Sequence, residues 1–166
     1  MVACTFFGHR ECPDAVEPRL WAVLETLIVE HGVDLFYVGH QGQFDALVRR
    51  TLRTLCQTYP RIHYAVVLAY LPGPGGDPQD YADTLFPEGI ETVPRRYAIS
   101  WRNRWMLGRA DYVVTYVTHS WGGAARFAEL AKKQGKMVWN LLSMHRIGES
   151  PCCEMQAHDK NDLKIE

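Results

Sequence analysis

Short apolar runs alternate along the chain with longer segments in which apolar residues recur at helical spacing. The apolar runs predict buried strands, and the longer periodic segments predict amphipathic helices. The predicted strands span residues 2–7, 35–38, 65–71, 112–116 and 137–142. The predicted helices span about residues 14–31, 44–59, 97–109 and 124–134. Because strands and helices alternate, we expect a three-layer α/β/α fold with a mainly parallel sheet of about five strands.

Local signals mark the ends of some elements and the limits of the domain. Asp14 and Glu17 have the spacing of a capping box at the start of the first helix. Residues 72–94 form a long irregular segment, within which residues 81–86 are expected to make a short helix. Residues 1–144 are expected to form one domain, followed by a polar, mobile tail over residues 145–166.

The charge balance is nearly neutral and the cysteine count is odd. The 166 residues include 18 Lys and Arg against 19 Asp and Glu, which gives a formal net charge of −1. Dedicated nucleic-acid-binding proteins are usually basic, so nucleic acid is not an expected partner. The cysteines lack the spacing of a disulfide framework, which indicates reduced thiols in a cytosolic protein. We also expect no signal peptide and no membrane partner. The cysteines are Cys4, Cys12, Cys56, Cys152 and Cys153.

Three glycine-containing turns follow predicted strands. They are Gly8-His9-Arg10, the turn from Gly39 to Gln43, and the turn from Ser120 to Gly123. In a parallel sheet the ligand sits beyond the carboxyl ends of the strands, where these turns meet. Gly122 and Gly123 also precede a helix, whose free N–H groups and dipole favour a phosphate. The alternative is that this glycine pair only eases the turn into the helix.

Each candidate side chain in these turns has a functional and a structural interpretation. Arg10 holds a phosphate or is a solvated loop arginine. For Asp45, the functional interpretation is that it accepts hydrogen bonds from ribose, and the structural one is that it only complements the helix dipole. For Trp121, the functional interpretation is that it stacks on a base, and the structural one is that it covers the end of the sheet. No His or Cys spacing matches a metal site, so no metal and no cofactor is expected. The candidate ligand-binding residues are Gly8, His9, Arg10, Gly39, His40, Gly42, Asp45, Arg102, Asn103, Trp121, Gly122 and Gly123.

Glu129 and Arg102 are the candidate catalytic residues. Glu129 is the carboxylate of the helix after the glycine pair, where it would act as an acid or base, and Arg102 would orient a phosphate. The alternative is that Glu129 forms a surface pair with Lys133, four residues later. Glu129 falls nearly opposite the apolar stripe of its helix, which favours the alternative.

The motifs together resemble the SLOG superfamily, which groups the Smf DNA-processing proteins with the LOG phosphoribohydrolases. The resemblance covers about residues 2–142 and is greatest to the YpsA-like branch. The matching pieces, in family order, are Thr5-Phe6-Phe7-Gly8-His9-Arg10, Gly39-His40-Gln41-Gly42-Gln43-Phe44-Asp45, Arg102-Asn103-Arg104-Trp105-Met106 with Ala110-Asp111, and Gly122-Gly123.

The resemblance implies a Rossmann-like sheet, a homodimer or higher homo-oligomer, and a nucleotide-type ligand. LOG enzymes cleave the N-glycosidic bond of nucleoside 5′-monophosphates, and Smf proteins bind single-stranded DNA. Arg102, Gly122, Gly123 and Glu129 match positions of the LOG motif. Trp121, Ala125 and Arg126 stand where that motif has proline, glycine and threonine.

Three hypotheses for function follow. The first is a cytosolic sensor or signalling module that binds a nucleotide or a nucleotide derivative. The second is a nucleotide N-glycosidase that uses Glu129 and Arg102, so whether the chain is an enzyme stays open. The third and most distant is a protein that interacts with single-stranded DNA through the arginines Arg49, Arg50 and Arg53.

Overall fold

Six strands form one parallel sheet in the computed structural model, which describes residues 1–71 and 83–143. Their order across the sheet is β4-β3-β2-β1-β5-β6, and every neighbouring pair is parallel. The strands are β1 (Val2–Gly8), β2 (Val33–Val38), β3 (His63–Val67), β4 (Thr84–Leu85), β5 (Tyr112–Tyr116) and β6 (Met137–Asn140).

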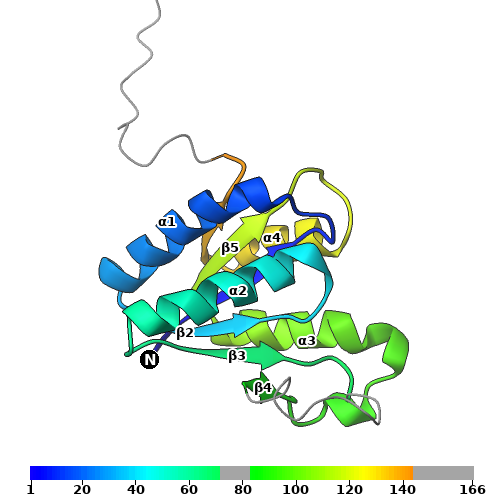
Figure 1. Cartoon of the computed structure of the whole chain (residues 1–166). Helices are drawn as coiled ribbons and strands as arrows, with labels where there is room; N and C mark the ends of the chain where they lie inside the picture. Colours follow the sequence, from blue (N-terminus) through cyan, green and yellow to red (C-terminus); the bar gives the residue numbers. More distant parts are fainter. Residues whose placement is uncertain (72–82, 144–166) are drawn as a thin grey trace, which may run out of the picture.

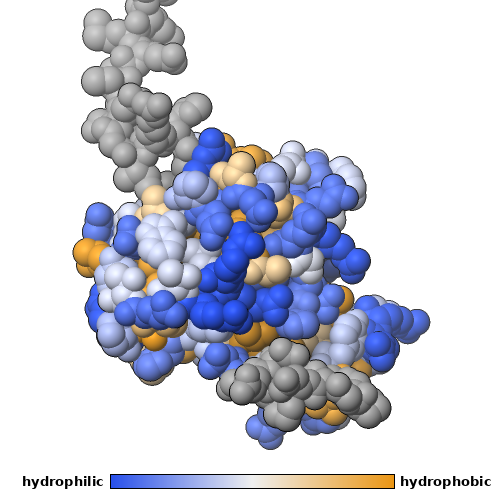
Figure 2. Space-filling model, viewed as in Figure 1, coloured by the Kyte–Doolittle hydropathy of each residue, from blue (hydrophilic) through white to orange (hydrophobic). Residues whose placement is uncertain are grey.

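Helices cover both faces of the sheet (Figure 1). The helices α1 (Glu17–Val29) and α2 (Gly42–Thr58) pack on one face, whereas α3 (Arg95–Arg109) and α4 (Gly123–Lys133) pack on the other. Figure 2 shows that the outward side of α1 and α2 is largely hydrophilic, as expected for amphipathic helices. The three-layer α/β/α fold predicted from the sequence is therefore confirmed.

The central strand β1 supplies apolar side chains to both layers. Phe6 packs with Phe36 in the core beneath α1 and α2, with ring centroids 6.2 Å apart. Phe7 points to the opposite face and stacks on Phe127 of α4 at 5.2 Å. Successive side chains of a strand alternate between faces, so a strand covered on both sides reads as the continuous apolar run seen here.

Carboxylates hold the amino-terminal end of the sheet. The backbone N–H of Val2 donates to Oδ1 of Asp34 at 2.8 Å, and that of Ala3 donates to Oδ2 of Asp111 at 2.9 Å. These bonds satisfy donors where β1 begins. The side chains that could serve a ligand gather at the opposite, carboxyl end of the strands.

The region after β3 differs from the sequence prediction. The strand ends at Val67. Leu68 still packs in the main core, whereas Ala69 packs with Ile90 and Ala98 in a small separate core. Thr84–Leu85 forms a two-residue strand, where part of a short helix was predicted. A strand this short carries no periodic signal, which explains why the sequence did not reveal it. Of the loop predicted over residues 72–94, residues 72–82 lie outside the described residues, as does the predicted tail.

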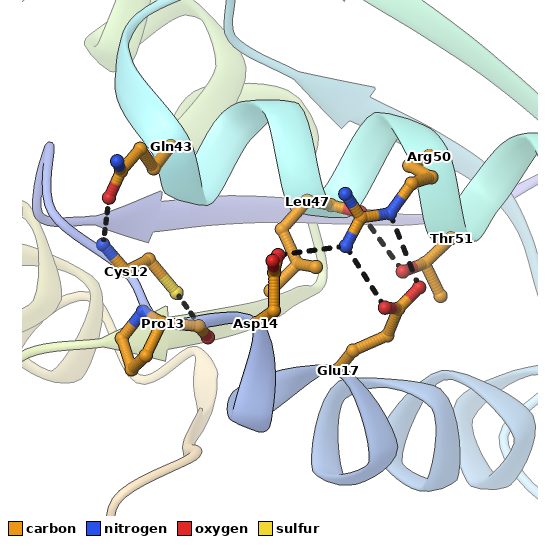
Figure 3. Close-up of polar contacts among 8 residues, drawn as sticks. All are labelled: Cys12, Pro13, Asp14, Glu17, Gln43, Leu47, Arg50 and Thr51. Atoms are coloured by element: carbon orange, nitrogen blue, oxygen red, sulfur yellow. Dashed lines mark hydrogen bonds and ion pairs between the residues drawn. The ribbon is translucent and has the colours of Figure 1, made fainter.

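The predicted capping box at the start of α1 is wrong. The N-cap position is Val16, and no side chain caps this end of the helix. Asp14 Oδ1 and Glu17 Oε2 instead each lie 3.0 Å from Nη2 of Arg50 on α2 (Figure 3). The two carboxylates therefore join the start of α1 to α2 through exposed ion pairs, which contribute little to stability individually.

The three described cysteines are free thiols. Burial raises the pKa of Cys4, which is fully enclosed, above its usual range. Burial also raises the pKa of Cys12 to about 11, with a smaller contribution from Asp14. These thiols are therefore protonated and unreactive at neutral pH. Cys152 and Cys153 lie outside the described residues.

We predict that Gly8→Ala destabilises the fold, because β1 and α2 approach closely at this glycine. A Cβ there would lie 2.1 Å from Cδ1 and 2.3 Å from Cγ of Phe44, which is fully buried. Overpacking of this kind costs about 1–3 kcal/mol in the free energy of unfolding, which denaturant titration measures. The matched control is Gly108→Ala in α3, where no atom lies within 4 Å of the added Cβ. The control is expected to stabilise by about 0.5–1 kcal/mol, and equal effects of both variants would contradict the close approach.

Candidate functional site

A cleft of about 1090 Å³ opens at the carboxyl ends of β1 and β5. The strand order places β2 on one side of β1 and β5 on the other, so this is the topological switch point of the sheet. Open parallel sheets bind their ligands at such points. The lining side chains come from the turns after β1 and β5, from the start of α2 and from the inner face of α3.

Most of the predicted ligand-binding residues do line this cleft. The exceptions are Gly39, His40 and Gly42, which are not among the lining residues. The predicted residues that line it are Gly8, His9, Arg10, Asp45, Arg102, Asn103, Trp121, Gly122 and Gly123.

The amino-terminal end of α4 opens into the cleft. Gly122 precedes the helix with φ of +92°, a left-handed value that favours glycine, and no side chain caps the helix. A Cβ on Gly123 would meet no atom within 4 Å. Gly122, Gly123 and Ala124 line the cleft, so the first-turn N–H groups, which have no partner within the helix, and the helix dipole add positive potential there.

The turn after β1 is fastened to the start of α2. The Gln43 N–H donates to the Arg10 carbonyl at 2.7 Å, and its side-chain Oε1 accepts from the Cys12 N–H at 2.9 Å (Figure 3). Gly42, with φ of +84°, allows this contact, because a Cβ there would lie 2.8 Å from Cα of Arg10. The backbone of Arg10 is thus held in place, while its exposed side chain lies at the edge of the cleft.

Arg102 forms part of the cleft wall and is only 3% exposed. Its Nη1 donates to the Val67 carbonyl at 3.3 Å, and its Nε donates to Oδ1 of Asn103 at 3.1 Å. Asp45 is 7% exposed and accepts a hydrogen bond from the Gln41 N–H at 2.8 Å. Burial lowers the pKa of Arg102, and the negative charge of Asp45 opposes this shift.

Gly39 lets the two buried charges approach each other. A Cβ on this residue would lie 2.4 Å from Oδ2 of Asp45 and 2.9 Å from Nη1 of Arg102. Burial raises the pKa of Asp45, whereas the Gln41 N–H bond and the charges of Arg102 and Arg49 lower it. Gly39 therefore acts indirectly, since it makes room beneath the cleft for an oriented guanidinium.

Three rings form a stack on one wall of the cleft. The His9 and His119 rings lie 3.7 Å apart at 17°, and the His119 and Trp121 rings lie 3.8 Å apart at 18°. His119 Nδ1 lies 2.9 Å from the Trp121 carbonyl, which can only accept, so Nδ1 carries the proton. The sequence placed His9 and Trp121 in turns, but the stack that they form with His119 was missed, because it depends on how two distant turns meet.

Glu129 lies outside the cleft. Its side chain is exposed and forms an ion pair at 2.8 Å with Lys132, rather than with the predicted Lys133. The hydrogen bond from Lys132 lowers the pKa of Glu129, which makes this group a poorer proton donor. The geometry does not support the predicted catalytic role of Glu129 or its pairing with Arg102.

The predicted arginine face of α2 is largely engaged within the protein. Arg50 contacts Asp14 and Glu17, and Arg53 lies near Tyr64, whose pKa it lowers against the larger, opposing effect of burial. Arg49 is half-buried and contributes to the potential at Asp45. This face therefore offers fewer free cations than its sequence suggests.

Within residues 1–71 and 83–143, no group of three or more His, Cys, Asp or Glu side chains is placed to hold a metal ion. None of the helices in these ranges is long and apolar enough to cross a membrane.

No family model matches the chain, and no curated protein matches its sequence. Solved structures match its fold. DNA processing protein A (DprA) from Streptococcus pneumoniae superposes with a TM-score of 0.62 and 16% identity, over 84% of this chain and 50% of that protein. DprA from Helicobacter pylori superposes with a TM-score of 0.58 and 14% identity, over 90% of this chain and 68% of that protein.

At such low identities these likenesses show the fold alone, and this chain spans about half the length of the Streptococcus pneumoniae protein. They agree with the Rossmann-like α/β fold implied by the resemblance to the SLOG superfamily. The narrower assignment to the YpsA-like branch stays a prediction.

The exclusion of nucleic acid as a partner is wrong. Both of the structures described above are DNA processing proteins, and the Helicobacter pylori protein binds single-stranded DNA. The exclusion relied on the net charge of −1, which averages over the whole chain. The net charge does not show that Arg10, Arg102 and a helix amino terminus lie together in one cleft.

We predict that Asp45→Ala lowers the free energy of unfolding by about 1–3 kcal/mol, because it leaves the Gln41 N–H without its acceptor and removes a negative charge that favours the buried Arg102. Asp45→Asn keeps an acceptor for the Gln41 N–H, so a smaller loss is expected. Glu129→Ala, which removes an exposed carboxylate, is the matched control and should change little. Denaturant unfolding measures all three, and a loss for Asp45→Ala no larger than that of the control would contradict the buried pair.

We predict that His9 makes the fold sensitive to acid. Burial, and secondarily the nearby His119, lower the pKa of His9 below its ordinary value of 6.5. The unfolded chain therefore binds this proton more readily, so stability is full above pH 6.5 and falls as the pH drops through the lower folded-state pKa. His9→Phe keeps a ring in the stack and should flatten this dependence between pH 7 and 5, measured by urea unfolding. A pH dependence in His9→Phe as steep as that of the wild type would contradict this role of His9.

Proposed function

We propose that the cleft binds a phosphate-bearing nucleotide or nucleotide derivative, and that the protein is a binding module for this ligand. The observation that carries the proposal is the uncapped amino terminus of α4, which opens into the cleft beside unoccupied space at Gly123. Backbone N–H groups at such a terminus bind phosphate with help from the helix dipole.

The charged side chains of the cleft support the same ligand. Arg10 lies at its edge, and Arg102 lies in its wall with Nη1 and Nε already oriented by hydrogen bonds. Asp45 is the buried acid nearby, and its charge is balanced by Arg102 and by the Gln41 N–H. Because the charges of Arg102 and Asp45 offset each other, the positive potential available to an anion comes from Arg10 and the amino terminus of α4, in a cleft that Glu11 also lines.

A binding role fits this site better than glycosidic cleavage. The hydrolase hypothesis requires Glu129 to reach the ligand, but this carboxylate is exposed, paired with Lys132 and absent from the cleft lining. A sensor needs only a selective pocket, which the oriented arginine and the helix terminus supply.

Single-stranded nucleic acid is the second candidate ligand. The exposed Trp121 ring on the cleft wall favours it, because single-strand-binding proteins combine cationic grooves with stacking platforms. The fold is also shared with a protein that binds single-stranded DNA. A free nucleotide and one unit of a strand present the same phosphate and base to this cleft.

We predict that Gly123→Asp separates stability from binding. A carboxylate in the first turn of α4 complements the helix dipole, which is worth about 0.3–1 kcal/mol, while it repels a bound phosphate. A side chain fits there, since no atom lies within 4 Å of the Cβ position. The fold should therefore be as stable as the wild type or more stable, with phosphate ligands bound much more weakly.

The matched control is Gly123→Asn, which has nearly the same shape without the charge. Thermal shift and calorimetry would compare both variants with nucleoside monophosphates, ADP-ribose, NAD, cyclic nucleotides and a single-stranded oligonucleotide. A ligand of the wild type should be bound better by the Asn variant than by the Asp variant. Equal binding by the two variants would contradict the α4 site, and no shift by any ligand would contradict the proposed function.

A further inference from the structure

The ring stack on the cleft wall ends in an uncovered indole. His9 and His119 stack at 3.7 Å, and Trp121 stacks on the other side of His119 at 3.8 Å, all three nearly parallel. Trp121 remains 71% exposed, so one indole face packs on His119 and the other is open. An exposed tryptophan held parallel to two further rings is a ready-made surface for another flat ring.

Two aromatic rings of α3 differ from Trp121, because each has a guanidinium over its face. An arginine guanidinium lies over Tyr97 at 4.7 Å and over Trp105 at 3.8 Å, from Arg96 and Arg109 respectively. Among the residues that the structure describes, no cation or second ring lies on the outer face of Trp121. Of these three rings, Trp121 is therefore the one without a guanidinium on its open face.

A hydrogen bond and ring stacking hold this indole in place. His119 Nδ1 donates to the carbonyl of Trp121 at 2.9 Å, which closes the short turn before α4 and aligns the two rings. His9 supports the stack from the turn after β1, and its Nε2 is buried without a hydrogen-bond partner among the described residues. The stack thus joins the two turns that border the cleft.

We propose that the outer face of Trp121 binds the base of the ligand and that it selects purines over pyrimidines. This inference rests on the proposed function, because it assigns the base of the nucleotide whose phosphate lies at α4. Trp121 is followed directly by Gly122 and Gly123, so consecutive residues serve the base and the phosphate of one nucleotide. A bicyclic purine overlaps the indole over more area than a pyrimidine does, and stacking strengthens with overlap.

The test measures dissociation constants by calorimetry for AMP, UMP and ribose 5-phosphate, with the wild type and with Trp121→Ala, Trp121→Phe and Tyr97→Ala. The wild type should bind AMP more tightly than UMP, and UMP more tightly than ribose 5-phosphate. Trp121→Ala should raise the AMP dissociation constant by a factor between about 5 and about 150, the range expected for one stacked base. The ribose 5-phosphate constant should stay unchanged.

The other variants show whether the effect belongs to the stack. Trp121→Phe keeps a smaller ring, so an intermediate AMP constant is expected. Tyr97→Ala removes another exposed aromatic ring outside the cleft and should bind AMP as the wild type does. The melting temperature of each variant confirms that it is folded.

Two outcomes would overturn the inference, and they are distinguishable. If ribose 5-phosphate binds as tightly as AMP, and Trp121→Ala changes neither constant, the base platform is wrong while the phosphate site at α4 stands. If AMP, UMP, ribose 5-phosphate and a single-stranded oligo(dA) all fail to bind, the proposed function itself fails and the platform with it.

The oligo(dA) arm also identifies the source of the purine. Binding tighter than that of AMP, and weakened by Trp121→Ala, would assign the base to a nucleic-acid strand. AMP binding as tight as that of the oligonucleotide would assign it to a free nucleotide. In either case the platform is supported only where Trp121→Ala weakens the binding, because that variant alone removes the indole face.

Discussion

The buried guanidinium of Arg102 is the constraint on which the cleft depends. A positive charge that is 3% exposed requires oriented acceptors and a counter-charge, and three separate elements supply them. The end of β3 contributes the Val67 carbonyl, α2 contributes Asp45, and the turn after β2 contributes the space at Gly39. The wall of the cleft is therefore set by the same contacts that hold α2, α3 and the sheet together.

The layered fold was predictable because its signals are periodic and local. The continuous apolar run of β1 and the helical spacing in α2 appear directly in the sequence, and Tyr112–Tyr116 matches its predicted range. Signals that depend on a distant partner were misjudged. Asp14 and Glu17 have capping-box spacing, but Arg50, more than 30 residues away, binds both carboxylates.

The site was predicted in its location more than in its chemistry. Strand ends and glycines indicated where the cleft lies, since the topology of a parallel sheet determines that edge. The burial of Arg102 beside Asp45 was not predictable, because helical spacing does not reveal a charge balanced by another element. Net charge misled in the same way, since it contains no information about where the cations lie.

The amino-terminal and carboxyl ends of the strands carry carboxylates with different roles. At the amino-terminal edge, Asp34 and Asp111 accept backbone N–H groups of β1, and neither lines the cleft. At the carboxyl edge, Asp45 balances the arginine of the cleft wall. The length of β1 separates the two ends of the strands. Substitutions that change the ligand preference at the carboxyl end therefore leave the hydrogen bonds at the amino-terminal end intact. The architecture thus lets ligand specificity diverge while the frame that carries it persists.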